Sequence, residues 1–123
     1  MTEQDHGKTF GSSEKAQMEI AWLEEHKGKN ITALSVNNSL TDVVIIVTSS
    51  SVRHGKSLAD GLIEFCKANH FEFFGKEGYD TGSWILVDLN DVIVHILSEE
   101  SRELYNLEGL LRDAEPFLLQ NRS

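Results

Sequence analysis

Residues 42–48, DVVIIVT, constrain the fold of this chain more than any other segment. Five consecutive residues in it are apolar and β-branched, with no polar residue alternating between them. Such a run is typical of a strand that is buried on both faces of its sheet. A sheet of that kind needs helices to cover it. The segment therefore predicts an α/β fold in which a mixed β-sheet is flanked by helices.

The length and the charge of the chain limit its organisation and its partners. A chain of 123 residues suggests a single domain with one core. The formal net charge of −9 opposes binding to DNA or RNA over most of the surface and favours a basic partner. Because no apolar run approaches the length of a membrane span, we expect no membrane partner.

The N-terminal residues and the cysteine content bear on the compartment. The N-terminal segment contains no apolar core of the kind found in signal peptides. Cys66 is the only cysteine, so an internal disulfide cannot form. Both observations favour a reducing compartment, and we expect the cytoplasm.

Composition divides the chain into three parts. Residues 1–11 are polar and contain two glycines, and we expect them to be disordered. We expect residues 12–115 to form the folded domain. Pro116 is the only proline, and we expect it to begin a C-terminal tail, 116–123.

Two long helices and several strands are predicted around the central run. Ser12 or Ser13 can cap a first helix, which Gly28 would end. Apolar residues at helical spacing predict an amphipathic helix over 51–69. The other predicted elements are strands at 31–36 and 71–74, a loop at 75–83, a hairpin at 84–97, and two short helices, SEESRELY and LEGLLRDA, the first capped by Ser98.

The segment 84–97, WILVDLNDVIVHIL, predicts a β-hairpin whose register can be read from the sequence. Asn90 and Asp91 suit the centre of a type I′ turn, because Asn and Asp tolerate a positive φ. That register gives one apolar set of cross-strand pairs for the core and one mixed set for the other face. The core pairs are Leu89 with Val92, Val87 with Val94 and Ile85 with Ile96, and the mixed pairs are Asp88 with Ile93, Leu86 with His95 and Trp84 with Leu97.

His95 lies on the mixed face as a diagonal neighbour of Asp88. Two interpretations stay open: a structural histidine under a covering helix, satisfied by Asp88 or a backbone carbonyl, and a functional residue. The sequence alone favours the structural role. A metal site from Asp88, Asp91 and His95 has little support, because no HxH, HExxH or paired-cysteine spacing is present. A serine nucleophile is also unsupported, because no GxSxG motif occurs.

The segment 48–60, TSSSVRHGKSLAD, ends the central strand and opens a helix. A strand, a small-residue turn and a helix N-terminus together resemble a phosphate-binding arrangement, although GxxxxGKS/T and GxGxxG are both absent. Arg53 and Lys56 lie in the first turns, where the helix dipole disfavours cations. They are either contacts for an anion or a partner, or solvated cations with Lys56 paired to Asp60. The sequence alone favours the second interpretation.

Two longer patterns resemble the ribosomal silencing factor family, also called the Iojap-related family, from about Ile20 to Ala114. The first is SLTDVVIIVTSSSVRHGKSLAD at 39–60, and the second is EG before a loop, then W-x-L-x-D-x-x-D-V-x-V-H-I, then R-x-x-Y-x-L-E. The second pattern is carried by Glu77, Gly78, Trp84, Leu86, Asp88, Asp91, Val92, Val94, His95, Ile96, Arg102, Tyr105, Leu107 and Glu108. The chain departs from the family at Asn90 (usually glycine), Leu111 (usually tryptophan), Ser35 (often aspartate) and Val43 (commonly aromatic).

The resemblance implies a function without catalysis. Family members bind the large ribosomal subunit through the ribosomal protein numbered fourteen, on the subunit-joining face. They sterically block joining of the small subunit and repress translation when nutrients are scarce. The family fold is similar to the nucleotidyltransferase fold without the metal-binding aspartate pair, so the resemblance implies no cofactor and no metal. Homodimers are known among relatives.

The residues expected to bind the partner come from the second pattern. Trp84, Arg102 and Tyr105 belong to residue types that are enriched at interface hot spots. We expect His95 to order this surface with Asp88 as its hydrogen-bond partner. The full predicted set is Trp84, Asp88, His95, Arg102, Tyr105, Leu107 and Glu108, with Arg53 and Lys56 as further contacts for an anion or a partner.

Two other functions stay open. One is a factor for assembly of the large subunit, a role that some relatives have in mitochondria or plastids. The other is a nucleotidyl- or phosphotransferase that would use Arg53 and Lys56 for phosphate and Asp88 and Asp91 for magnesium.

Overall fold

Strand β2 (Val43–Ser49) is the centre of the fold, and every one of its residues is buried. The structure, a computed structural model, describes residues 11–36, 41–110 and 115–116. Strand β2 pairs in parallel with β5 and antiparallel with β1, in a sheet of order β3-β4-β5-β2-β1-β6. The other strands are β1 (Lys29–Ser35), β3 (Gly75–Glu77), β4 (Trp84–Asp88), β5 (Val92–Ser98) and β6 (Glu115–Pro116). The predicted α/β fold with a mixed sheet is confirmed.

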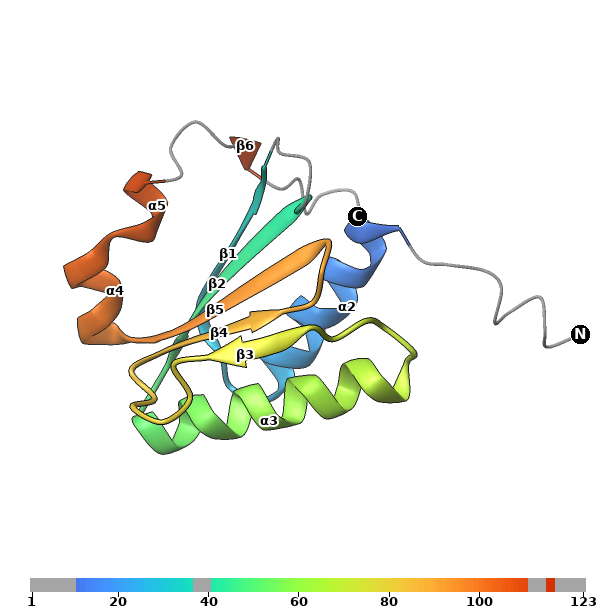
Figure 1. Ribbon diagram of the computed structural model, residues 1–123. Coiled ribbons are helices and arrows are strands. Elements are labelled where there is room, and N and C mark those ends of the chain that lie inside the picture. The colour runs from blue at the N-terminus through green and yellow to red at the C-terminus, as the bar shows by residue number, and fades with distance from the viewer. Residues whose placement is uncertain (1–10, 37–40, 111–114, 117–123) are drawn as a thin grey trace, which may run out of the picture.

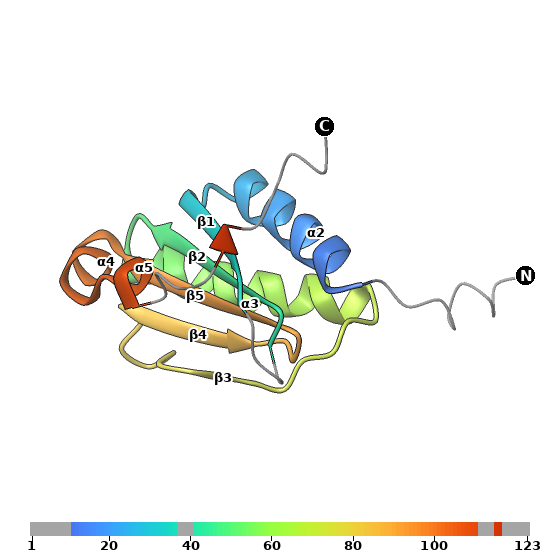
Figure 2. The ribbon, with the colours of Figure 1, turned by 90° about the horizontal axis from the view of Figure 1, so that it is seen from above.

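Two long helices cover one face of this sheet, which we call the first face. These are α2 (Ser12–Glu25) and α3 (Val52–Ala68), which lie side by side in Figures 1 and 2. Their apolar stripes pack on alternate strand residues such as Ile45, Ile85 and Ile96, all fully buried. This packing forms the main core, as the period-two pattern of the strands requires.

The opposite, second face carries a smaller apolar cluster. Its buried members are Val44, Ile46, Leu97 and Leu107. The helices on this side are α4 (Glu99–Tyr105) and α5 (Leu107–Leu110), apart from α2 and α3 in Figure 1. Trp84, Ile93, Leu34 and Val36 on this face are only partly buried. The second face is therefore incompletely covered by the residues that the structure describes.

The parallel strands β2 and β5 determine where the helices lie. The two strands end side by side, with Ser49 opposite Ser98. From that point the chain after β2 enters α3 on the first face, and the chain after β5 enters α4 on the second. As predicted, Ser98 is the N-cap of α4, and its Oγ accepts a hydrogen bond from the backbone N–H of Ser101 at 3.1 Å.

The ends of α2 differ from the prediction. Neither Ser12 nor Ser13 is the N-cap; Gly11 is, and its N–H donates to Oε1 of Glu14 at 2.9 Å. Past the C-terminal end of the helix, Lys27 adopts the left-handed conformation (φ 73°), and the N–H of Gly28 donates to the carbonyl of Leu23 at 2.8 Å. This is a Schellman ending with lysine in the position that glycine usually takes.

A glycine is nevertheless required at position 28. A Cβ there would lie 2.7 Å from Cγ2 of the buried Val47. Gly28 thus permits close approach of the turn to β2, and its neighbour Lys27 adopts the positive φ.

The predicted strand at 71–74 is wrong. Phe71 is buried, and its N–H donates to the carbonyl of Cys66 in the turn after α3. The strand begins at Gly75, inside the segment predicted to be a loop, and pairs with β4. The three phenylalanines in 71–74 have high β-propensity, but tertiary packing determines the conformation here.

The C-terminal boundary also differs from the predicted one. Pro116 pairs with Leu34 of β1, so the sheet continues into the segment predicted as a tail. The predictions for residues 1–10, 111–114 and 117–123, including Leu111, lie outside the described residues.

A buried acid lies between the helices of the first face. Glu19 has no exposed surface, and its Oε2 accepts a hydrogen bond from Sγ of Cys66 at 3.7 Å. Its other oxygen, Oε1, has no hydrogen-bond partner among the described residues. Burial, aided by the nearby charge of Asp91, raises the pKa of Glu19 to about 8. Glu19 is therefore mainly an uncharged carboxylic acid at neutral pH.

Candidate docking surface

The β4–β5 hairpin has the predicted register. Leu86 lies opposite His95 and Trp84 opposite Leu97, so Trp84, Leu86 and His95 share the second face. The turn itself differs from the predicted type I′, because only Asn90 has a positive φ (76°). The carboxylate of Asp88 accepts a hydrogen bond from the N–H of Asn90 at 2.9 Å and thereby stabilises the turn.

The prediction that His95 forms a hydrogen bond with Asp88 is wrong, because its partner is Trp84. Nε1–H of Trp84 donates to Nδ1 of His95 at 3.0 Å. Trp84 and Asp88 are both diagonal neighbours of His95, but the indole reaches farther, and the carboxylate of Asp88 holds the turn. Because an indole N–H is only a donor, Nδ1 of His95 carries no proton.

The imidazole of His95 is therefore neutral, with its proton on Nε2. Burial in the second face lowers the pKa of His95 to about 4. At neutral pH the group presents an N–H donor and no charge.

Tyr105 of α4 completes a cluster of rings with these two residues. Its ring centroid lies 4.8 Å from that of Trp84, at an interplanar angle of 44°, and Trp84 lies 6.0 Å from His95. We call Trp84, His95 and Tyr105 the aromatic cluster. Tyr105 is 48% exposed, while Trp84 and His95 are partly buried. Such tilted contacts within 7 Å are favourable geometries for aromatic pairs.

Arg102 holds α4 against the sheet through its guanidinium. Nη1 donates to Oγ1 of Thr48 at 3.0 Å and to the carbonyl of Asn30, while Nη2 donates to Oγ1 of Thr32 at 2.9 Å. Nε and Nη2 both bind Oε2 of Glu108 at the start of α5. We call Arg102, Glu108 and these sheet contacts the arginine clasp.

The arginine clasp leaves little of the Arg102 side chain exposed for contact with another molecule. Its side chain is only 13% exposed. Although burial acts in the opposite direction, the hydrogen bonds and charge of Arg102 hold the pKa of Glu108 below its ordinary value. Leu107, which lies between Arg102 and Glu108 in the sequence, is buried beside Ile46 and Leu97.

The structure therefore separates the seven predicted partner-binding residues into three groups. The aromatic cluster is together at the surface, and Arg102, Leu107 and Glu108 lie behind it as supports. Asp88 is the last residue of β4, and its carboxylate binds the hairpin turn. The sequence reasoning missed Leu104, which is 71% exposed on α4 and had no signal beyond its place in a short helix.

The serines at the start of α3 form hydrogen bonds within the fold. Oγ of Ser51 accepts from the N–H of His54 at 3.0 Å, and the N–H of Ser50 donates to Nδ1 of His54 at 2.9 Å. Arg53 is exposed. Nζ of Lys56 lies 5.4 Å from the ring centroid of Tyr79, in the range of a cation–π contact.

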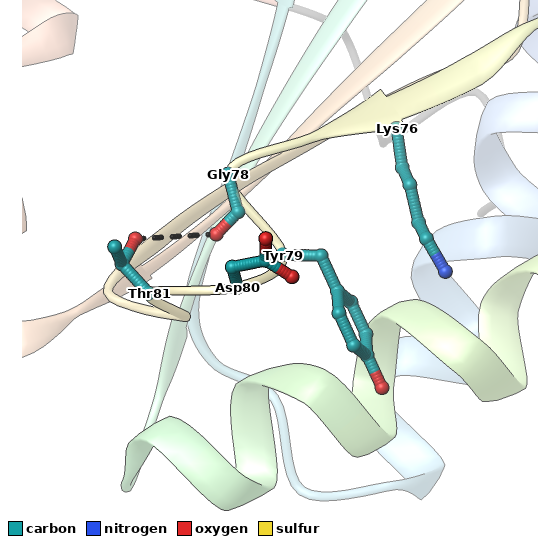
Figure 3. A pocket seen from close by; sticks show the side chains of 5 residues that line it. All are labelled: Lys76, Gly78, Tyr79, Asp80 and Thr81. Atoms are coloured by element: carbon teal, nitrogen blue, oxygen red, sulfur yellow. Dashed lines mark hydrogen bonds between the residues drawn. The ribbon is translucent and has the colours of Figure 1, made fainter.

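The expected pairing of Lys56 with Asp60 is replaced by other contacts. The hydroxyl of Tyr79 donates to Oδ2 of Asp60 at 2.7 Å, and Lys76 forms an ion pair with Asp60 at 3.8 Å. Figure 3 shows Tyr79 pointing from its loop toward α3, at the edge of a pocket of about 380 Å³. The pocket is lined by Lys76, Gly78, Tyr79, Asp80 and Thr81.

The residues considered for a metal do not form a site. Asp91 forms an ion pair with Lys15 at 3.3 Å, and Asp88 holds the turn. Among the described residues, no group of three or more His, Cys, Asp or Glu side chains could hold a metal ion. In the same part of the chain no helix is long and apolar enough to cross a membrane.

These features define a class: a single-domain α/β protein with a partly exposed aromatic cluster on one sheet face. A family model described as "Ribosomal silencing factor during starvation" matches residues 10–122. The chain therefore belongs to the ribosomal silencing factor family.

Curated relatives and solved structures agree with this assignment. The ribosomal silencing factor of Haemophilus influenzae is 46% identical over 90 residues, which cover 72% of this chain and 88% of the relative. The one from Chromobacterium violaceum is 34% identical over 105 residues, covering 84% and 86%. A crystal structure of a Chromobacterium violaceum protein matches with a TM-score of 0.79 at 34% identity, covering 82% of this chain and 86% of that one. A Bacillus halodurans structure has a TM-score of 0.73 at 28% identity, covering 80% and 94%.

Proposed function

We propose that this protein binds the large ribosomal subunit through the aromatic cluster and blocks joining of the small subunit. The observation that carries the proposal is the partly exposed set of Trp84, His95 and Tyr105 on an incompletely covered sheet face. Trp and Tyr are enriched at the centres of protein interfaces. The neutral His95 is a donor that can enter such an interface without the desolvation of a charge.

The charge of the chain supports a basic protein as the partner. With a net charge of −9, association with a basic surface is steered by attraction, whereas contact with bare RNA is opposed. The proposed partner is the ribosomal protein numbered fourteen on the subunit-joining face, as the family resemblance implies.

An assembly role is the second candidate, and two relatives bear on it: the first is named for assembly of the large subunit, and the second shares with it only a mitochondrial name. One is "Mitochondrial assembly of ribosomal large subunit protein 1" of mouse, 26% identical over 106 residues. The other is "Protein Iojap-related, mitochondrial" of Arabidopsis thaliana, 30% identical over 95 residues. An assembly factor would bind precursor subunits in preference to mature ones.

The transferase alternative has less support. It assigned Asp88 and Asp91 to magnesium, but Asp88 accepts the N–H of Asn90 and Asp91 pairs with Lys15. Saturable ATP binding that requires magnesium and is lost in Asp88→Asn would favour it over the regulator.

Sucrose-gradient sedimentation tests the proposal. The protein should travel with purified large subunits and should reduce formation of joined ribosomes when small subunits are added. Tyr105→Ala and Trp84→Ala should weaken binding roughly tenfold or more. Phe74→Ala is the control, because Phe74 is 63% exposed outside the aromatic cluster. The proposal fails if wild-type protein stays at the top of the gradient at low salt, and preference for precursor subunits would favour assembly.

A further inference from the structure

Two segments of this acidic chain carry only positive charge. The whole chain has 20 Asp and Glu residues against 11 Lys and Arg residues. Residues 26–36 and 43–59 nevertheless contain no Asp or Glu. The lysines and arginines in these two segments are Lys27, Lys29, Arg53 and Lys56. The sign of the charge is therefore reversed locally.

The fold brings these cations to one corner of the molecule. Lys29 begins β1 and pairs with Thr48 near the end of β2, so the turn before β1 and the turn before α3 lie at the same end of the sheet. His54 joins the two turns. Its Nδ1 accepts a hydrogen bond from the N–H of Ser50 at 2.9 Å, so the proton is on Nε2, which donates to the carbonyl of His26 at 2.9 Å.

Three cations at this corner are exposed and are not neutralised by an acid. We call Lys27, Lys29 and Arg53, which are all exposed, the basic corner. None of the three forms an ion pair with another residue that the structure describes. The fourth cation, Lys56, lies over the ring of Tyr79 instead. The basic corner therefore presents three charges to the surroundings.

Two of these cations occupy locally unfavourable positions. Lys27 has a left-handed backbone (φ 73°), which glycine adopts more freely. Arg53 lies in the first turn of α3, which contains no acid and where the helix dipole disfavours a cation. Two local rules broken at one corner point to a partner that the cations bind.

The basic corner borders the docking surface. Arg102, which holds α4 against the sheet, donates to the carbonyl of Asn30, the residue after Lys29. The strands that lead into α3 and α4 also end side by side, with Ser49 opposite Ser98. Figure 1 shows α4 and the start of α3 on the same side of the molecule. A subunit bound at the aromatic cluster is therefore within reach of the basic corner.

We propose that the basic corner binds the phosphate backbone of ribosomal RNA beside the docking surface. The inference rests on the proposed function and adds a second class of partner to it. The guanidinium of Arg53 can hold a phosphate through two hydrogen bonds, and Lys27 and Lys29 supply point charges. Such contacts carry no sequence information but fix the orientation of a protein on its site. The corner thus orients a protein that the aromatic cluster has docked.

Binding of fluorescently labelled full-length protein to purified large subunits, measured over a range of salt concentrations, tests the inference. Lys29→Gln with Arg53→Gln should weaken binding roughly tenfold at low salt. Each lost phosphate contact should also reduce the slope of log Kd against log salt concentration by roughly 0.7 to 0.9. The matched control is Lys67→Gln with Lys76→Gln, because both lysines are exposed outside the corner and the change in net charge is the same. Equal affinities and slopes for the two double variants would overturn the inference.

Photo-crosslinking identifies the molecule that the corner contacts. Ser57→Cys places a thiol at an exposed position four residues, about one helical turn, from Arg53. A photoreactive maleimide would label this thiol alone, because Cys66 is fully buried. Irradiation of the labelled protein on large subunits should join it to ribosomal RNA. Products that contain only ribosomal protein or a second copy of this chain, or no product, would overturn the assignment to RNA.

The outcomes separate this inference from the proposed function. If wild-type protein does not bind large subunits, both fail. If wild type binds and Trp84→Ala weakens binding, while the corner variant matches its control, only the role of the basic corner is overturned.

Discussion

At the residue scale, Trp84 connects Tyr105 with His95 in the candidate docking surface. Its ring packs against Tyr105 of α4, and its N–H fixes the tautomer of His95 on β5. A phenylalanine in its place would keep most of the packing and lose the donor. The two contributions can therefore be measured separately.

Trp84→Phe should raise the pKa of His95 above its value of about 4 and destabilise the fold. The hydrogen bond from the indole stabilises the neutral imidazole, so its loss makes protonation easier. The lost bond should lower the free energy of unfolding by about 1 kcal/mol. An NMR titration of His95 and urea denaturation measure the two effects. Trp22→Phe, at the other tryptophan, is the control, and an unchanged His95 titration in Trp84→Phe would contradict this explanation.

Arg102→Lys should destabilise the fold although it keeps the charge. A lysine ammonium cannot reach Glu108, Thr32 and Thr48 with the geometry of the guanidinium fork. We expect a loss of roughly 2 kcal/mol, the range for hydrogen bonds of charged groups. Urea denaturation of Arg102→Lys, Glu108→Gln and the double variant gives the coupling between them. Purely additive effects would show that the clasp does not act as a unit.

At the element scale, the C-terminal end of α2 offers a stabilising change. Lys27 has a left-handed backbone, which an L-residue adopts at a cost and glycine adopts freely. Lys27→Gly should therefore raise the free energy of unfolding by up to about 1 kcal/mol. The control is Lys67→Gly inside α3, where the same exchange should lower stability by about 1 kcal/mol. Thermal denaturation of both variants gives the signs, and equal signs would refute the left-handed explanation.

The sequence predicted the strands correctly where a local pattern of residues determines them. The β-branched run of β2 and the alternation of the hairpin predicted burial and register correctly. The segment 71–74 was mispredicted as a strand, because Phe71 and Phe73 pack against the core in an irregular segment after α3.

The residues of the candidate site could be named from the sequence resemblance, but their contacts could not be predicted. The sequence resemblance named Trp84, His95 and Tyr105, yet the sequence reasoning gave His95 the partner Asp88, whereas its partner in the structure is Trp84. The clasp role of Arg102 depends on Thr32, which lies 70 residues away in the chain. No local pattern encodes a contact of that range, so the sequence did not predict that Arg102 holds α4 against the sheet.

At the scale of the whole molecule, the buried Glu19 and the partly buried His95 set opposite pH dependences. Glu19 has a folded pKa of about 8 against an ordinary 4.5, so between these values only the folded state holds its proton. Its contribution to stability falls as the pH rises through that window. His95 has a folded pKa of about 4 against 6.5, so its contribution falls as the pH drops through that window.

The two contributions should cancel from pH 4.5 to 6.5 and leave the Glu19 slope from pH 6.5 to 8. That slope approaches about 1.4 kcal/mol of lost stability per pH unit. Urea denaturation across pH 5 to 8 measures it. Glu19→Gln should flatten the slope above pH 6.5, and His95→Gln should extend the Glu19 slope downward to pH 4.5. A slope unchanged in Glu19→Gln would contradict the assignment to this carboxyl.

The parallel pairing of β2 with β5 also governs the order in which the chain folds. The β4–β5 hairpin joins neighbouring residues and can form within microseconds. Val43 and Val92 are 49 positions apart and meet only after α3 and the hairpin have brought the chain back. Closing the loop between β2 and β5 costs conformational entropy before any contact between the two strands offsets that cost. We therefore expect the pairing of β2 with β5 to limit the folding rate. We therefore expect the contacts of α4 with β1 and β2, made through Arg102, to form only after β2 has paired with β5.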